Sequence, residues 1–189
     1  MTGQVGGSRA DRLMTGGASS SAHGRRPASS TLSAAEVSDL KELDTVDVSV
    51  RFAWRDAAPV TLDVQEKLAF PPLQQIAGLY RLTLVSRPGQ RRPRVYIGET
   101  DNLSRRLAGN NRNPGPSQQT SLRVNAFLRE HLGAGGVVQL AVTTVAMVQL
   151  ADRDKQELDL TRKAARLLTE SAALILARIT DESDIENLG

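Results

Sequence analysis

Apolar and polar residues alternate strictly in the segment VDVSVRFAWR, which begins at Val46 and ends at Arg55. A period of two places successive side chains on opposite faces of a strand, so this segment predicts a β-strand with one buried and one solvated face. Further strands are predicted at 78–85 (GLYRLTLV), at 94–98 (RVYIG) and in the β-branched segment 137–148.

The strands at 78–85 and 94–98 are separated by the segment SRPGQRRP, in which Pro88 and Gly89 signal a turn. Two strands joined in this way pair as an antiparallel hairpin, and the loop of this hairpin is rich in Arg. The secondary structure of the segment 61–68 is ambiguous, and Pro71 and Pro72 end it.

Helices are predicted by capping residues and by apolar residues three and four positions apart. Ser33 and Glu36 form a capping box for a short helix that ends near Leu43. Asp101 or Asn102 is placed to cap a second helix directly after the strand at 94–98.

Two longer helices follow. One is expected at 121–132, where the Gly-Ala-Gly-Gly segment at 133–136 ends it. The last runs from about Asp152 to Arg178, and Glu170 lies beside its apolar stripe. The members of this stripe, which we expect to be buried, are Leu160, Ala164, Leu167, Leu168, Ser171, Leu174 and Ile175.

The order of these elements predicts the organisation of the chain. Residues 1–33 are mainly Gly, Ser, Ala and Arg and bury too little surface to offset the entropy of ordering, so we expect a flexible tail. Residues 34–77 form an N-terminal extension with a short helix and a strand, and residues 78–189 form the main domain. Strands followed by helices predict an α+β fold, with a small central antiparallel β-sheet flanked by helices.

The composition excludes several kinds of site. The chain has no Cys and only two His, His23 and His131, which excludes disulfides, Cys nucleophiles and zinc sites built on Cys or paired His. No apolar run is long enough to cross a membrane, and no apolar leader marks the chain for secretion. We therefore expect a soluble, cytoplasmic protein with no membrane partner.

Positive charge is concentrated in one part of the sequence. Residues 81–130 contain ten Arg and three acidic residues, whereas the whole chain has a net charge of +3. The planar guanidinium of Arg suits phosphate oxygens, so a nucleic acid is the expected partner of this segment. The structural alternative is a solvated loop whose Arg side chains bind nothing.

The chain has only two Tyr, and they lie in the two hairpin strands, Tyr80 in Gly-Leu-Tyr and Tyr96 in Tyr-Ile-Gly. On a hairpin their hydroxyls can meet at a common site. These motifs, followed by NLSRRL at 102–107 and TESAALILA at 169–177, resemble the GIY-YIG nuclease family in order and spacing. The resemblance covers residues 78–189.

This resemblance implies a nuclease domain that hydrolyses phosphodiester bonds in DNA with a divalent metal. It implies four catalytic residues. Glu170 would be the metal ligand, for Mg²⁺ or Mn²⁺, and Arg106 would bind the scissile phosphate. Tyr80 would position or deprotonate the attacking water, and Tyr96 would orient water or phosphate. Gly98 would let the backbone approach where a side chain would obstruct.

A second group of residues is expected to bind nucleic acid. Its members are Arg91, Arg92, Arg94, Arg105, Asn110, Arg112 and Asn187. Asn187 equally suits a frayed chain end, because only two residues follow it. Two positions depart from the family. Asn110 stands where many relatives place His or Tyr and cannot act as a general base, and Glu99 stands where some relatives have Lys.

Structural alternatives accompany these assignments. The two Tyr could be ordinary strand residues with solvated hydroxyls. Glu170 could form a surface ion pair with Arg166 four positions earlier, in a network that includes Arg162.

The leading functional hypothesis is a metal-dependent DNA endonuclease of restriction or defence, mobile-element or repair type, and a homodimer would allow it to cut both strands. The alternative is a catalytically weak nucleic-acid-binding module with the same fold. A third hypothesis is that the Arg-rich hairpin loop binds an acidic protein surface.

Overall fold

The computed structural model describes residues 31, 33–42, 45–86, 92–151, 153–180 and 184–186. The chain divides into two units, Met1–Leu43 and Asp44–Gly189. The predicted tail therefore lies almost wholly outside the described residues.

In the first unit, helix α1 (Ala34–Ser38) begins with the predicted capping box. The Ser33 hydroxyl accepts the Glu36 N–H, and the Glu36 carboxylate accepts the Ser33 N–H. The helix ends five residues before Leu43, which corrects the predicted length. None of its residues is buried, and a helix this short has no packing to extend it.

The second unit is built on a five-stranded sheet with the order β10-β6-β5-β7-β2. The three long strands are β5 (Gly78–Val85), β6 (Arg94–Thr100) and β7 (Val137–Thr143), and the short edge strands are β2 (Arg55–Asp56) and β10 (Asp184–Ile185). All neighbours pair antiparallel except β10, which pairs parallel with β6. The predicted hairpin of β5 and β6 is confirmed.

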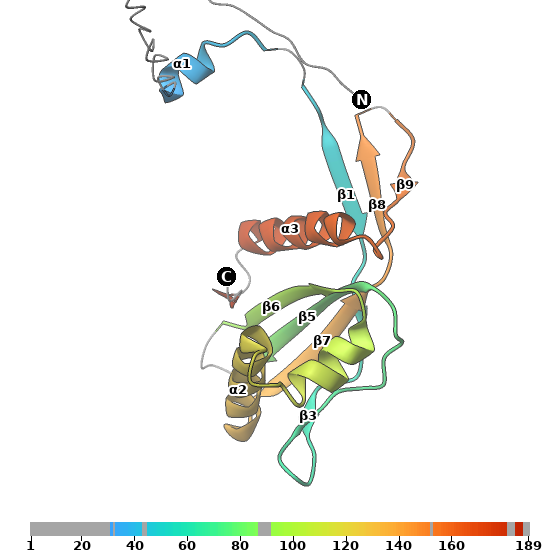
Figure 1. Ribbon diagram of the computed structural model, residues 1–189. Coiled ribbons are helices and arrows are strands. Elements are labelled where there is room, and N and C mark those ends of the chain that lie inside the picture. The colour runs from blue at the N-terminus through green and yellow to red at the C-terminus, as the bar shows by residue number, and fades with distance from the viewer. Residues whose placement is uncertain are drawn as a thin grey trace, which may run out of the picture. The chain divides into compact units, whose positions relative to one another are not determined.

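Helices cover both faces of this sheet (Figure 1). Helix α3 (Lys163–Ile179) runs along one face, where it contacts β5 and β6. Helix α2 (Gln119–Gly133) and the π-helical segment η1 (Arg105–Asn111) lie on the opposite face. The predicted α+β class, a central antiparallel sheet flanked by helices, is therefore confirmed.

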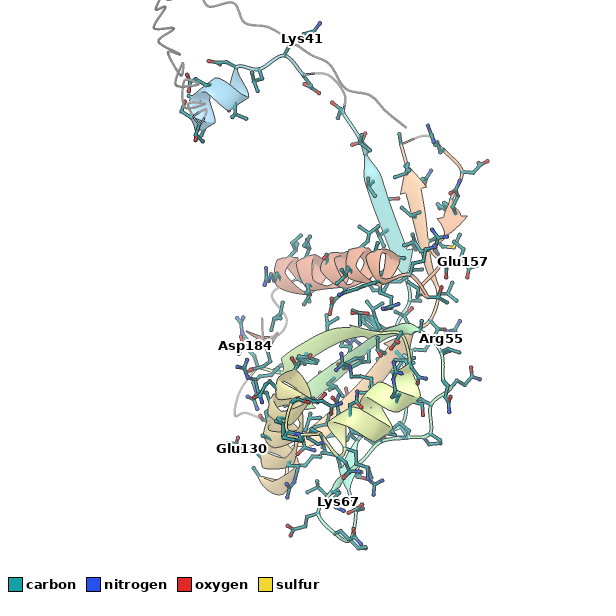
Figure 2. All side chains as sticks on the ribbon, viewed as in Figure 1. Lys41, Arg55, Lys67, Glu130, Glu157 and Asp184 are labelled. Carbon is teal, nitrogen blue, oxygen red and sulfur yellow. The ribbon has the colours of Figure 1, made fainter. Side chains whose placement is uncertain are left out.

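Side chains lie on both sides of the sheet, between it and the helices (Figure 2). The larger core, beneath η1 and α2, includes Tyr80, Leu82 and Tyr96. The smaller core, beneath α3, contains Val95 and Ile97 from the same hairpin. The hairpin therefore contributes one face to each core, as its period of two requires.

Residues 45–77 pack into this same unit. Strand β1 (Val48–Phe52) pairs with β8 (Ala146–Leu150) in a three-stranded sheet that β9 (Gln156–Glu157) completes. Strands β3 (Thr61–Leu62) and β4 (Leu68–Ala69) form a small hairpin, at which Figure 2 shows Lys67. Two residues of this segment, Val60 and Leu68, are fully buried in the larger core: Val60 is 1% exposed and Leu68 is 0% exposed.

The predicted strand at 137–148 is wrong in its continuity. It is broken at 144–145, and its two halves, β7 and β8, belong to different sheets. The Thr143 hydroxyl donates to the Val145 carbonyl at 3.0 Å, which supports the local bend. The predicted strand at 46–55 is wrong in the same way, because β1 ends at Phe52 and Arg55 belongs to β2 in the other sheet. Strand β1 alternates as predicted, but Val48 and the preceding Val46 are exposed, so the apolar row is only partly covered.

The last helix also differs from its prediction. Helix α3 begins at Lys163, because the preceding residues form β9 and a turn in which Asp159 accepts the Thr161 N–H. Its buried positions are Arg166, Thr169 and Ala173. The predicted stripe is therefore wrong in most of its members: Leu160 is buried but precedes the helix, and Leu167, Leu168 and Ile175 are exposed. Leu174 does pack against the smaller core.

In the described part of the chain, every helix is too short or too polar to cross a membrane.

Candidate active site

The register of the hairpin brings the two Tyr together. Tyr80 pairs with Gly98 and Leu82 pairs with Tyr96, so both Tyr point to the same face with ring centroids 6.0 Å apart. A Cβ atom on Gly98 would lie 2.6 Å from the Tyr80 hydroxyl oxygen. The Tyr80 ring therefore occupies the space that a side chain at position 98 would need, as the sequence predicted for this glycine.

The two Tyr differ in their surroundings. Burial raises the pKa of Tyr80 far above its usual value, since this side chain is only 2% exposed. Burial also raises the pKa of Tyr96. Their mutual hydrogen bonding raises the pKa of Tyr80 and lowers that of Tyr96. Both phenols are therefore neutral at physiological pH.

Segment η1 brings Arg106 to the two Tyr. The predicted cap is present, because the Asn102 side-chain oxygen accepts the Arg105 N–H at 2.8 Å. The positive charge of Arg106 lowers the pKa values of both Tyr, which places its guanidinium near their hydroxyls. Its Nη1 donates to the Ser121 hydroxyl at 3.4 Å, a long contact that leaves most of its donors available.

Glu170 reaches the same place from α3. Burial raises the pKa of its carboxyl, and the negative charge of Glu99 raises it further. The Glu99 backbone N–H and the Arg106 charge act in the opposite direction. The negative charge of Glu170 also raises the pKa of Tyr96. The structure thus brings all four predicted catalytic residues into one cluster.

The predicted alternative pairing of Glu170 with Arg166 does not occur. Arg166 is buried, and its Nε donates to the Glu99 carboxylate. Its Nη1 donates to the carbonyls of Leu160 and Thr161 at 3.0 and 2.8 Å. The negative charge of Glu99 is therefore compensated by an ion pair that ties α3 to β6.

A polar depression of about 300 Å³ opens beside this cluster. Its lining residues are Glu99, Thr100, Asp101, Arg105, Arg106, Asn110, Lys163 and Arg166. Arg105 pairs with Asp101 at 2.7 Å and Arg166 pairs with Glu99. Arg106 and Lys163, by contrast, have no carboxylate partner within the part of the chain that the structure describes. These two positively charged side chains are therefore available to bind an anion in the depression.

The predicted nucleic-acid-binding residues are only partly brought together. Arg105 and Asn110 line the depression. Arg94 instead pairs with Glu186 at 3.2 Å, and Arg112 pairs with Asp63 at 2.7 Å. Arg92 is exposed, next to a loop that is not described. The remaining two, Arg91 and Asn187, lie outside the described residues.

Three residues near the site were not among the predicted site residues. Lys163 lines the depression. No motif in the sequence marks it, because it lies in the middle of the helix predicted from about Asp152 to Arg178. Glu99, which departs from the family pattern, is largely buried and ion-paired with Arg166. Asn111 is buried, 1% exposed, beside Tyr80, whose pKa its side-chain amide lowers. The one feature of the sequence that could have suggested Asn111 is that it directly follows Asn110, a predicted site residue.

The donor set suits a hard divalent cation. Burial and the nearby Glu99 both disfavour the negative charge of Glu170, and a cation there would relieve this effect. Among the described residues, no three His, Asp or Glu side chains gather in one place. A cation held by one carboxylate and several waters, the habit of Mg²⁺, fits such a site.

Comparisons with known proteins add little. No family model matches the sequence, and no curated protein matches it. A solved structure of a mutant of bacteriophage T4 EndoII is similar over 66% of this chain and 88% of that chain, with a TM-score of 0.44 and 15% sequence identity. A similarity this slight carries no argument.

Proposed function

We propose that this protein is a divalent-metal-dependent DNA endonuclease of the GIY-YIG type. The observation that carries the proposal is the convergence of Tyr80, Tyr96, Arg106 and Glu170, which come from four separate elements, β5, β6, η1 and α3. The structural alternatives, ordinary strand Tyr and a surface Glu, do not explain why these residues lie close to Arg106. The order of the sequence motifs supports the same conclusion.

The electrostatics support a phosphodiester as the ligand. Arg106 and Lys163 face the depression without a carboxylate partner among the described residues. A bound phosphate would form charge-assisted hydrogen bonds with both side chains. Arg106 then remains near the charge that develops on the phosphoryl oxygens during hydrolysis. Arg105, already paired with Asp101, would contact the DNA backbone at the rim.

Glu170 would hold Mg²⁺ or Mn²⁺, which would neutralise phosphoryl charge and acidify a bound water. The two Tyr would act on that water as neutral hydroxyls, because burial disfavours both phenolates. Tyr96 is the less buried of the two, and the negative charge of Glu170 raises its pKa. We therefore propose that Tyr96 contacts the water. Tyr80 would orient Tyr96 through their shared hydrogen bond.

A second candidate function is nucleic-acid binding without cleavage. The observation that favours it is the raised pKa of both phenols, since neither Tyr then ionises readily enough to act as a base, and the Asn110 amide cannot act as one. This candidate keeps phosphate binding by Arg106 and Lys163 and predicts no metal-dependent cutting.

Incubation with supercoiled plasmid distinguishes the two candidates. We expect the wild type to nick or linearise DNA with Mg²⁺ or Mn²⁺ but not with EDTA. Glu170→Gln should abolish cutting and retain DNA binding in gel-shift assays. The matched control is Glu130→Gln, an exposed α2 residue that should cut normally. Plasmid that stays intact with either metal, while gel shifts show binding, would favour the second candidate.

Double-strand cutting by one such site requires two copies or two events. We propose a homodimer as the cutting form. Linear product that appears without a nicked intermediate, from protein that elutes as a dimer, supports this proposal.

A further inference from the structure

A second polar hollow lies where the chain passes between the two larger sheets, from β1 to β2 and from β7 to β8. Its volume is about 190 Å³. Arg51 of β1 and Arg55 of β2 line it, together with Thr143 and Thr144 at the end of β7. It shares no lining residue with the depression at Arg106, so it is a separate feature of the surface.

The alternation of β1 and β2 directs both Arg side chains away from α3. Phe52 and Trp54 pack against the smaller core beneath α3, whereas Arg51 and Arg55 are exposed. The register agrees with this direction, because Arg55 pairs with Val142, which packs against the larger core on the other face of the sheet. The hollow therefore opens on the face that carries η1 and the two Tyr.

The same register sets the distance from this hollow to the proposed active site. Val142 pairs with Tyr80, and Tyr80 pairs with Gly98. Arg55, Val142, Tyr80 and Gly98 thus form one row across the neighbouring strands β2, β7, β5 and β6. Since neighbouring strands lie about 4.8 Å apart, the Arg55 backbone is about 10 Å from that of Tyr80 and about 14 Å from that of Gly98.

Both Arg side chains are free to bind an anion. Neither Arg51 nor Arg55 forms an ion pair with a carboxylate in the part of the chain that the structure describes. Asp56, the next residue of β2, points to the opposite face of the sheet. Glu157 belongs to the same cross-strand row as Arg51, but Met147 lies between them. Two guanidinium groups at one hollow suit the oxygens of a phosphate.

The separation of the two sites matches a DNA backbone. One strand of a duplex carries a phosphate about every 3.4 Å along the axis, so 10–14 Å spans about three to four nucleotides. A duplex whose scissile phosphate lies at Arg106 therefore has further phosphates at the distance of Arg55. A chain of regularly spaced charges can occupy both sites at once, whereas one acidic side chain of a protein partner can occupy only one.

We propose that the hollow lined by Arg51, Arg55 and Thr144 binds a second phosphate of the DNA, about three to four nucleotides from the phosphate that is cut. This inference deepens the proposed function and rests on it for the identity of the ligand. It extends the DNA interface beyond the residues of the hairpin and η1, onto the segment that precedes β5.

Binding of a synthetic DNA duplex by the full chain in EDTA tests the inference without any need for cutting. Combining Arg51→Gln with Arg55→Gln should lower the affinity by about 10-fold. It should also reduce the slope of log affinity against log salt concentration by about 1, because one phosphate contact is lost. Glu157→Gln, which removes a negative charge from the same row, should raise the affinity.

The matched control removes the same charge elsewhere. Arg129→Gln combined with Arg178→Gln changes two exposed residues near the C-terminal ends of α2 and α3 and should leave the slope unchanged. Figure 2 shows Glu130, the neighbour of Arg129, well separated from Arg55. Circular dichroism checks that each variant folds.

The possible outcomes separate this inference from the proposed function. Equal salt slopes for the wild type and the variant of Arg51 and Arg55 overturn the inference, and so does an equal loss of slope in the control. A wild type that shows the expected slope change but cuts no DNA overturns the endonuclease proposal and leaves the inference standing. A wild type that binds no DNA overturns both.

Discussion

A methyl group added at Gly98 tests the packing of the site most directly. Gly98→Ala places a Cβ 2.6 Å from the Tyr80 hydroxyl oxygen and 2.7 Å from Cζ. Ordinary van der Waals contact begins at 3.4 Å, so the Tyr80 hydroxyl oxygen and the strand must separate by about 0.8 Å, from 2.6 to 3.4 Å. Tyr80 is 2% exposed and cannot swing into solvent.

The size of the effect follows from this displacement. Forcing an extra methyl group into a packed core costs about 1–3 kcal/mol. For a chain of this length, that corresponds to a loss of about 2–12 °C in Tm. A shift of nearly 1 Å in a hydroxyl of the site is also expected to lower the cleavage rate by about 100-fold.

Thermal unfolding followed by circular dichroism and plasmid nicking measure the two effects separately. Gly133→Ala is the matched control, because a Cβ there meets nothing within 4 Å. Alanine in the last turn of α2 should leave Tm unchanged or raise it slightly. A Gly98→Ala protein that unfolds at the wild-type temperature would refute the packing argument, whatever its activity.

Three further predictions concern the charged residues. Glu170→Gln should raise Tm at pH 7, because the folded protein disfavours the ionised Glu170 carboxyl. The difference in Tm between variant and wild type should vanish below the ordinary Glu pKa of 4.5, where Glu170 is protonated in both the folded and the unfolded protein. Arg166→Met should lower Tm by about 6–20 °C, the effect of about 3–5 kcal/mol for removing one member of a buried pair; a loss under 2 °C would contradict this. Glu99→Gln should move the acid limb of the pH profile of kcat/KM to lower pH, because without the Glu99 charge Glu170 ionises more easily; a limb that moves to higher pH would show that the charge of Glu99 does not act on Glu170.

The sequence predicted the hairpin and the common face of its two Tyr well because these depend on local rules. Alternation placed Tyr80 and Tyr96 on one face, and the Asn102 cap started the segment that carries Arg106. These features require only neighbouring residues, so a single sequence contains the information.

The errors arose where tertiary contacts override local patterns. Helix α3 buries Arg166, a residue that hydrophobic periodicity assigns to solvent, because Glu99 and two carbonyls satisfy its donors. The apolar run at 137–148 looked like one strand, yet its halves pair with β5 and β1 in different sheets. The π-helical winding of η1 has no periodic signal in so short a segment, so Asn111 could not be separated from Asn110.

The ion pair between Arg166 and Glu99 also bears on how this site can change in evolution. Because the pair is largely buried, replacing either residue alone leaves an uncompensated charge next to Glu170. Homologous sequences should therefore vary at the two positions jointly. A homologue with Lys directly after Tyr-Ile-Gly should lack Arg four residues before the helical Glu, so the two positions together form a sequence marker for this version of the site.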